Sequence, residues 1–104
     1  MKLQVGPMTL KDQYLYLGDG EPPMKFTPKE SAILAVLMKS PGQVASRAKL
    51  MKEVWQTDYL GDTRTLDVHL CWLHQKLEQD PANPQFLMTE RGVGYRLNVP
   101  QVIR

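Results

Sequence analysis

The 104-residue sequence has a single cysteine, Cys71, and no apolar run near the ~18 residues that a membrane span requires. One cysteine excludes an internal disulfide framework and is typical of a reducing compartment. No apolar signal-peptide core follows Met1 and Lys2. With 42% hydrophobic and 23% charged residues, the sequence predicts one soluble, cytoplasmic globular domain over residues 1–104, without a membrane anchor.

The sequence also lacks the usual constellations of catalytic or metal-binding residues. His69 and His74 are five residues apart, about 140° around a helix, so they do not face one another as metal ligands four apart would. Gly92 and Gly94 lie between two predicted strands and precede no helix, which argues against a phosphate-binding loop. We therefore predict no catalytic residue, no metal site and no cofactor.

Net charge is low, at +2, and its distribution is more informative than its total. Residues 31–56 carry +3 and residues 81–104 carry +2, whereas residues 57–80 carry −3. The total alone does not indicate a nucleic-acid-binding protein, but the positive charge is concentrated in two separate blocks.

Residues 1–27 are predicted to form a four-stranded antiparallel sheet. Short alternating or β-rich segments surround Leu3, Leu10, Leu15 and Met24, and Gly18-Asp19-Gly20 is a strong turn signal. A sheet of this kind needs one of its faces covered by another element.

Residues 28–80 are predicted to contain three helices. Thr27-Pro28-Lys29-Glu30 has the pattern of a capping box with proline at the first helical position, ahead of apolar residues 33, 34, 37 and 38. Ser46 can cap a second helix, and Asp62 or Thr63 a third. The third helix has an inward stripe at helical spacing: Leu66, Leu70, Leu73 and Leu77.

Residues 85–99 are predicted to form a strand, a glycine-containing turn with Arg91, and a second strand. A sheet, three helices and a basic hairpin, in this order, indicate the α+β class and a winged helix-turn-helix, with the hairpin as the wing.

The third helix presents a distinctive face opposite its leucines. Val68 and Cys71 lie there, flanked by Thr65, His69 and Trp72. Trp72 either packs against a neighbouring element such as the hairpin or lies on a contact surface, where aromatic residues concentrate. In a major groove it could touch thymine methyl groups.

Several polar residues around this face could contact DNA phosphates. Arg64 lies beside the amides at the helix start, and Thr65, His69 and Lys76 can donate hydrogen bonds from its flanks. Arg91 beside two glycines could enter a narrow minor groove. The alternatives are a solvated helical face and a plain turn with an exposed arginine.

The sequence resembles the DNA-binding effector domain of OmpR/PhoB-type response regulators, which form the output half of bacterial two-component systems. The most specific segments are Arg64-Thr65-Leu66-Asp67-Val68-His69-Leu70 and Thr89-Glu90-Arg91-Gly92-Val93-Gly94-Tyr95-Arg96. The resemblance implies a third helix in the major groove, a wing in the minor groove, and head-to-tail dimers on tandem direct repeats of double-stranded DNA.

The resemblance also implies roles for individual residues. Phosphate contacts would come from Arg64, Thr65, His69, Thr89, Gly92 and Tyr95. Val68, Cys71 and Trp72 would face bases, and Arg91 would enter the minor groove. The loop that such regulators can present to RNA polymerase corresponds to residues 56–62, including Gln56, Asp58, Tyr59 and Asp62.

Two departures from the family pattern affect these expectations. The family usually has arginines near Cys71, Trp72 and His74, so we expect weaker, less salt-dependent binding and a base preference shifted from guanine toward thymine. The receiver domain, which a sensor kinase phosphorylates, is absent from these residues. This absence favours a fragment of a longer regulator over regulation without a phosphoaspartate.

Sequence-specific binding of double-stranded DNA for transcriptional control is therefore the leading hypothesis, with a monomeric domain that dimerises on DNA. The main alternative is a winged-helix protein-interaction module that uses the acidic loop and Trp72 and has little DNA affinity. An effector that binds only when tethered into a dimer is a third.

Overall fold

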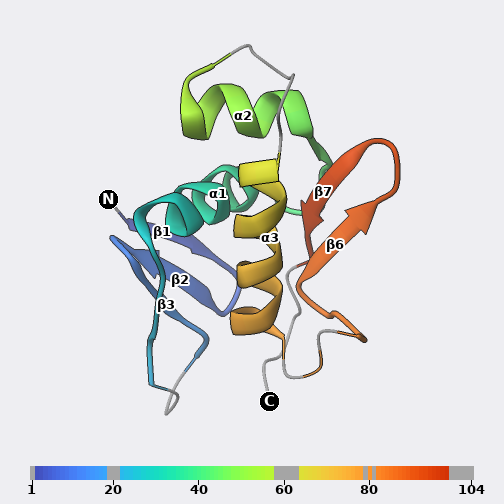
Figure 1. Cartoon of the computed structure of the whole chain (residues 1–104). Coiled ribbons are helices and arrows are strands. Elements are labelled where there is room, and N and C mark those ends of the chain that lie inside the picture. Colours follow the sequence, from blue (N-terminus) through green and yellow to red (C-terminus); the bar gives the residue numbers. More distant parts are fainter. Residues whose placement is uncertain (1, 19–21, 58–63, 79, 81, 99–104) are drawn as a thin grey trace.

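The computed structural model describes residues 2–18, 22–57, 64–78, 80 and 82–98. Within these residues it confirms the predicted α+β fold, with a four-stranded antiparallel sheet, three helices and a C-terminal hairpin (Figure 1).

The N-terminal sheet has the strand order β1-β2-β3-β4. Its side chains alternate between the two faces, as the pleat requires. Leu10 and Leu15 form a cross-strand pair and are buried, whereas Tyr14 and Tyr16 are exposed on the other face. The strands are β1 (Lys2–Val5), β2 (Met8–Lys11), β3 (Tyr14–Tyr16) and β4 (Met24–Lys25).

Helix α1 (Pro28–Lys39) begins with the predicted capping box. The Thr27 hydroxyl accepts from the Glu30 backbone N–H at 3.2 Å, and the Glu30 carboxylate accepts from the Thr27 N–H at 2.8 Å. The sequence indicated one apolar stripe, but residues 30–38 are buried at every position except Ala32. The reason is that α1 occupies the centre of the fold, between the N-terminal sheet and the other helices (Figure 1).

Two further helices follow, α2 (Arg47–Trp55) and α3 (Arg64–Leu77). Ser46 caps α2 as predicted, with its hydroxyl accepting from the Lys49 N–H at 3.0 Å. The four predicted leucines of α3 are all buried: Leu66, Leu70, Leu73 and Leu77. The predicted caps of α3, Asp62 and Thr63, lie outside the described residues.

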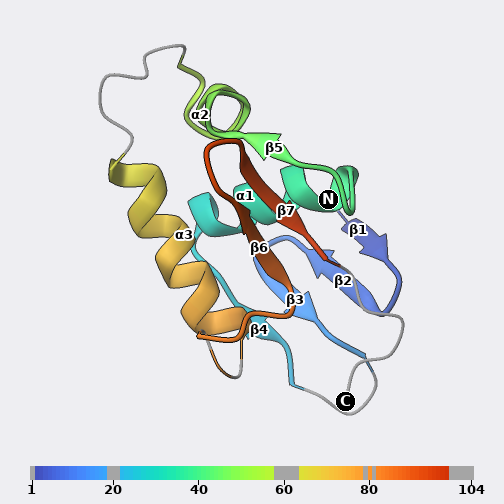
Figure 2. The same cartoon turned by 90° about the vertical axis from the view of Figure 1, so that its right-hand side faces the viewer.

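The predicted hairpin consists of β6 (Leu87–Glu90) and β7 (Gly94–Leu97). A short strand that the sequence analysis missed, β5 (Ala45–Ser46), pairs with β7, so the wing is a three-stranded sheet in the order β5-β7-β6 (Figure 2). Two residues are too few to show alternation in a sequence. The pairing also needs a residue without a side chain at Gly94, because a Cβ there would overlap the Ala45 carbonyl.

Candidate nucleic-acid interface

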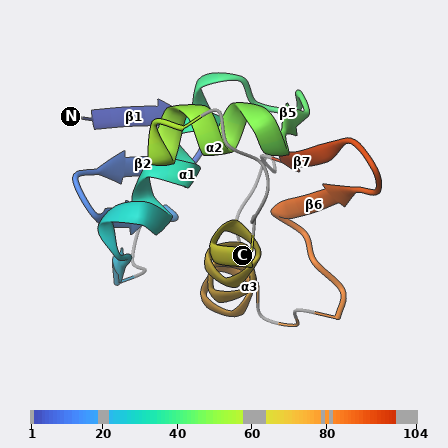
Figure 3. The same ribbon diagram turned by 45° about the horizontal axis from the view of Figure 1, so that its top comes forward.

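The outer face of α3 is exposed and lies beside the hairpin. Val68 and Trp72, one turn apart, are each 44% exposed, and Thr65, Cys71 and Gln75 are also exposed. Helix α3 contacts β6, and the turn of the hairpin lies at the same end of the molecule as the first turn of α3 (Figures 1 and 2). Figure 3 likewise shows the hairpin, β6 and β7, beside α3.

Trp72 does not serve as a core residue. Its exposed fraction is that of a surface side chain, and its ring contact is with His69 of the same helix, with the centroids 5.1 Å apart. The alternative that Trp72 packs against the hairpin therefore finds no support here.

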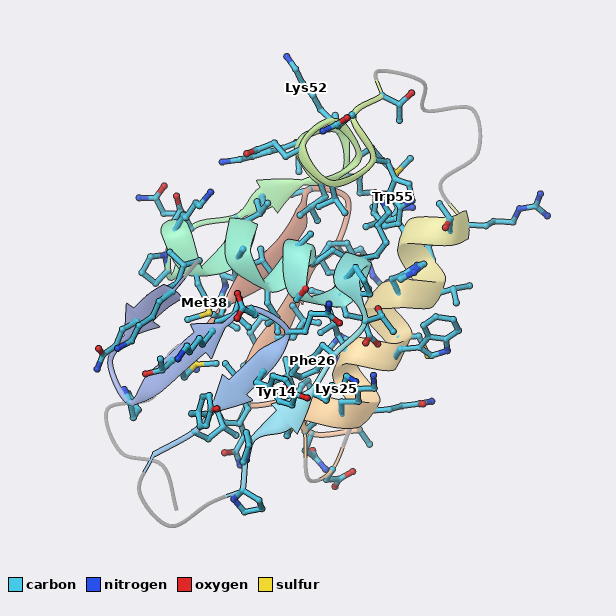
Figure 4. The ribbon with its side chains drawn as sticks, turned by 90° about the vertical axis from the view of Figure 1, so that its left-hand side faces the viewer. Tyr14, Lys25, Phe26, Met38, Lys52 and Trp55 are labelled. Atoms are coloured by element: carbon cyan, nitrogen blue, oxygen red, sulfur yellow. The ribbon has the colours of Figure 1, made fainter. Side chains whose placement is uncertain are left out.

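His69 is held on both sides by neighbouring groups. Its ring meets Trp55 of α2 edge-on, with the centroids 5.3 Å apart, and Figure 4 shows Trp55 between α2 and the start of α3. Its Nδ1 lies 2.7 Å from the Thr65 carbonyl oxygen, so Nδ1 must carry the hydrogen. In the neutral ring Nε2 is then an acceptor, and His69 can donate to a phosphate through Nε2 only when doubly protonated.

Arg47, at the start of α2, joins three elements. Its guanidinium pairs with Asp67 of α3 at 2.7 Å and donates to the Tyr95 hydroxyl of β7 at 3.1 Å. The hydrogen bond to Asp67 raises the pKa of Arg47, against the opposing effect of burial. This link sets the position of the wing relative to α3, and it leaves the Tyr95 hydroxyl hydrogen for another acceptor.

Lys76, which the sequence analysis placed among the phosphate-contacting residues, forms an ion pair within the domain. Its ammonium pairs with the Glu30 carboxylate at 2.7 Å and lies 5.4 Å from the centre of the Phe26 ring. The Glu30 side chain is fully buried, and a buried carboxylate needs a cationic partner. Lys76 is thus directed toward the start of α1, a placement that does not favour the phosphate contact predicted for it; that contact stays a prediction.

The same contacts set the ionisation of Glu30. Burial acts to raise the pKa of its carboxyl, but the hydrogen bonds from Lys76 and Thr27, together with the Lys76 charge, hold the pKa below its ordinary value. Glu30 therefore stays ionised and joins α1 to α3.

The turn of the wing carries the predicted arginine at its tip. Arg91, Gly92 and Val93 are all exposed, and Gly92 has φ 77°, a left-handed conformation that favours glycine. Arg96 pairs with Glu90 at 2.6 Å within the hairpin, whereas Arg91 has no ion pair with any residue that the structure describes. Thr89 and Tyr95 are cross-strand partners in the same hairpin.

A carboxylate that the sequence analysis missed joins α3 to the wing. Glu78 directly follows α3, is 6% exposed, and accepts hydrogen bonds from the backbone N–H groups of Gln85, Phe86 and Leu87 at 2.7, 3.0 and 2.9 Å. A carboxylate at the C-terminal end of a helix opposes the helix dipole. The position of Glu78 directly after a predicted helix was therefore the sequence signal that its carboxylate accepts hydrogen bonds from groups outside that helix.

The structure describes only some of the remaining residues that were predicted to belong to a site. Arg64 is exposed at the first position of α3, and Gln56 ends α2 in a left-handed conformation. Asp58, Tyr59 and Asp62, predicted to belong to the RNA polymerase loop, lie outside the described residues. Within the described ranges no three His, Cys, Asp or Glu side chains are grouped to hold a metal ion, and no helix there is long and apolar enough to cross a bilayer.

Because the imidazole of His74 is partly buried, we expect the free energy of unfolding to depend on pH. Burial lowers the pKa of its imidazole, and the charge of Glu78 offsets part of the shift. Below about pH 6.5 the unfolded state then binds more protons than the folded state, so stability falls as the pH drops. We expect a lower Tm near pH 5.5 than near pH 7.5, and a smaller difference in His74→Gln. The same acid-induced loss in both proteins would contradict this assignment.

Comparison with known proteins shows the family to which the chain belongs. A family model described as transcriptional regulatory protein, C terminal, matches residues 20–97. The chain is 44% identical over 96 residues to the sensory transduction protein RegX3 of Mycolicibacterium smegmatis, covering 91% of this chain and 42% of that protein. It is 45% identical over 74 residues to the alkaline phosphatase synthesis transcriptional regulatory protein SphR of Synechococcus elongatus, covering 71% and 29%.

The chain thus spans less than half the length of these two relatives. Among solved structures, it is similar to the DNA-binding domain of Klebsiella pneumoniae RstA in complex with the RstA box. The TM-score is 0.81 at 26% identity, covering 95% of this chain and 98% of that one. The chain therefore belongs to the family of C-terminal domains of transcriptional regulatory proteins, of the OmpR/PhoB response-regulator type.

Proposed function

We propose that this chain binds double-stranded DNA in a sequence-specific manner, with α3 in the major groove and the turn of the wing in the adjacent minor groove. The observation that carries the proposal is that Val68 and Trp72 of α3 are exposed, as is Arg91 in the turn of the hairpin whose strand β6 contacts α3. The buried leucines on the inner side of α3 hold the helix rigidly while its outer face enters the groove.

The charges of the site indicate modest electrostatic affinity. Lys76 is turned toward Glu30, and Arg47 is paired with Asp67. On the outer face of α3 the described cation is Arg64, at its start. Because each phosphate contact contributes about 0.9 to the salt dependence of binding, few contacts mean a shallow salt slope for one domain. Binding as a head-to-tail dimer on tandem repeats would compensate through the higher effective concentration of the second domain.

The wider regulatory role belongs to the same proposal. In a longer protein, a receiver domain phosphorylated by a sensor kinase would control dimerisation on DNA, and the loop after Gln56 would contact RNA polymerase. Transcriptional output of a two-component system is the function that this arrangement supports best.

A titration at two salt concentrations tests the proposal. Anisotropy of a labelled duplex, with tryptophan fluorescence as a second readout, should report binding that weakens as salt is raised. Failure to bind at the lowest salt, with or without artificial dimerisation, would favour the alternative of a protein-interaction module.

Two variants with the same loss of charge locate the contact. Arg91→Ala should weaken binding, most on A·T-rich flanks, and lower the salt slope by about 0.9. Lys11→Ala removes an exposed charge from β2, in the N-terminal sheet, and should change neither quantity. Equal effects of the two substitutions would argue against placing the wing in the minor groove.

A further inference from the structure

The outer face of α3 is apolar where base pairs would be read. Val68 and Trp72 lie four residues apart on one face, with exposed Cys71 beside Trp72. After Arg64, the only cation of α3 other than its histidines is Lys76, which is bound to Glu30. Bidentate recognition of guanine O6 and N7 needs an arginine or lysine, so the centre of this face lacks the side chains that read guanine.

The Trp72 indole is also held in position before any ligand binds. It packs on His69, whose Nδ1 donates to the Thr65 carbonyl and whose ring meets Trp55. Trp55 in turn packs against the core, and the Lys29 ammonium lies 5.4 Å from the centre of its ring. A side chain that is already ordered loses little conformational entropy on binding.

We infer that Val68 and Trp72 recognise the 5-methyl groups of thymine in the major groove, so that the target of this domain is specified by T·A pairs. The inference rests on the proposed function. Thymine is the base that presents an apolar group in that groove, and burying one methyl group corresponds to about a fourfold change in affinity. Arg91 in a narrow minor groove would favour the same A·T-rich sequences.

The test combines a base analogue with a protein variant. Duplexes bound by the 104-residue domain are selected from a random pool, and each thymine is then replaced singly by deoxyuridine, which lacks only the methyl group. For the unmodified protein, we expect one or two replacements to weaken binding about fourfold each. For Trp72→Ala or Val68→Ala, the effect at the corresponding position should disappear, because the methyl group has lost its partner.

Tyr14→Ala is the matched control, since it removes an exposed aromatic ring from β3, in the N-terminal sheet. It should retain the full deoxyuridine effect. Thermal unfolding of each variant shows whether it is folded.

The possible outcomes separate the two proposals. Salt-dependent binding with no deoxyuridine effect, or with the same effect in Trp72→Ala, overturns thymine recognition and leaves DNA binding intact. Selected sites dominated by G·C pairs at the contacted positions overturn it as well. Absence of binding to any duplex overturns the proposed function, and the inference with it.

Discussion

Glu78→Ala is expected to lower the free energy of unfolding by about 2–4 kcal/mol. The substitution leaves the backbone N–H groups of Gln85, Phe86 and Leu87 without their acceptor, and the last of these lies in a buried part of the chain. In a domain of this size the loss corresponds to a decrease in Tm of more than about 10 °C, which thermal unfolding by circular dichroism would measure.

Two further substitutions make this expectation specific. Glu78→Gln keeps one acceptor oxygen and should cost less than alanine. Glu53→Ala removes an exposed side chain of the same type, whose ion pair among the described residues is a surface pair with Lys49 at 3.9 Å, so it should change stability by less than about 0.5 kcal/mol. A Glu78→Ala protein as stable as Glu53→Ala would show that the carboxylate does not anchor the wing.

Gly94→Ala is expected to lower both the free energy of unfolding and the affinity for duplex DNA. A Cβ at this position would overlap the Ala45 carbonyl and approach the Ser46 backbone, and neither is a flexible side-chain end that can move aside. Strands β5 and β7 would have to separate, at a cost of about 1–3 kcal/mol, and Tyr95 would shift away from Arg47. The wing would then lie at a different position relative to α3, so duplex affinity should fall more than stability alone explains.

Gly42→Ala, in the turn after α1 and away from the proposed DNA contacts, is the comparison for this steric effect. Nothing lies within 4 Å of a Cβ at Gly42, so its cost comes only from the left-handed backbone, about 1 kcal/mol. Duplex binding at a temperature where both variants are folded would distinguish them. Equal affinities would mean that the β5–β7 pairing does not position the wing.

Local signals in the sequence predicted much of the fold. The capping box at Thr27, the Ser46 cap and the leucine stripe of α3 act over three or four residues along the chain, and all three are present. The exposure of Val68 and Trp72 follows from the same periodicity, because a helix that buries one face must present the other.

Other features could not be deduced from the chain because their partners are distant in sequence. Lys76 lies near the edge of the outer face of α3, and periodicity alone placed it among the DNA contacts. In the structure, the Lys76 ammonium instead donates to the buried carboxylate of Glu30, 46 residues earlier in the chain. A long flexible side chain can reach either side of its helix, and a buried carboxylate such as that of Glu30 is costly without a cationic partner.

The sequence by itself determined the order of the main sheet, the three helices and the hairpin, the starts of α1 and α2, and the side of α3 that is buried, since each depends on residues within a turn or two. Only the tertiary structure decided how the outer face of α3 and the hairpin are held in place. Arg47 meets Asp67 and Tyr95, His69 lies between two tryptophans, and Glu78 binds the start of the wing. These contacts depend on packing, which brings groups from separate elements within hydrogen-bond reach and removes the water that would otherwise satisfy them.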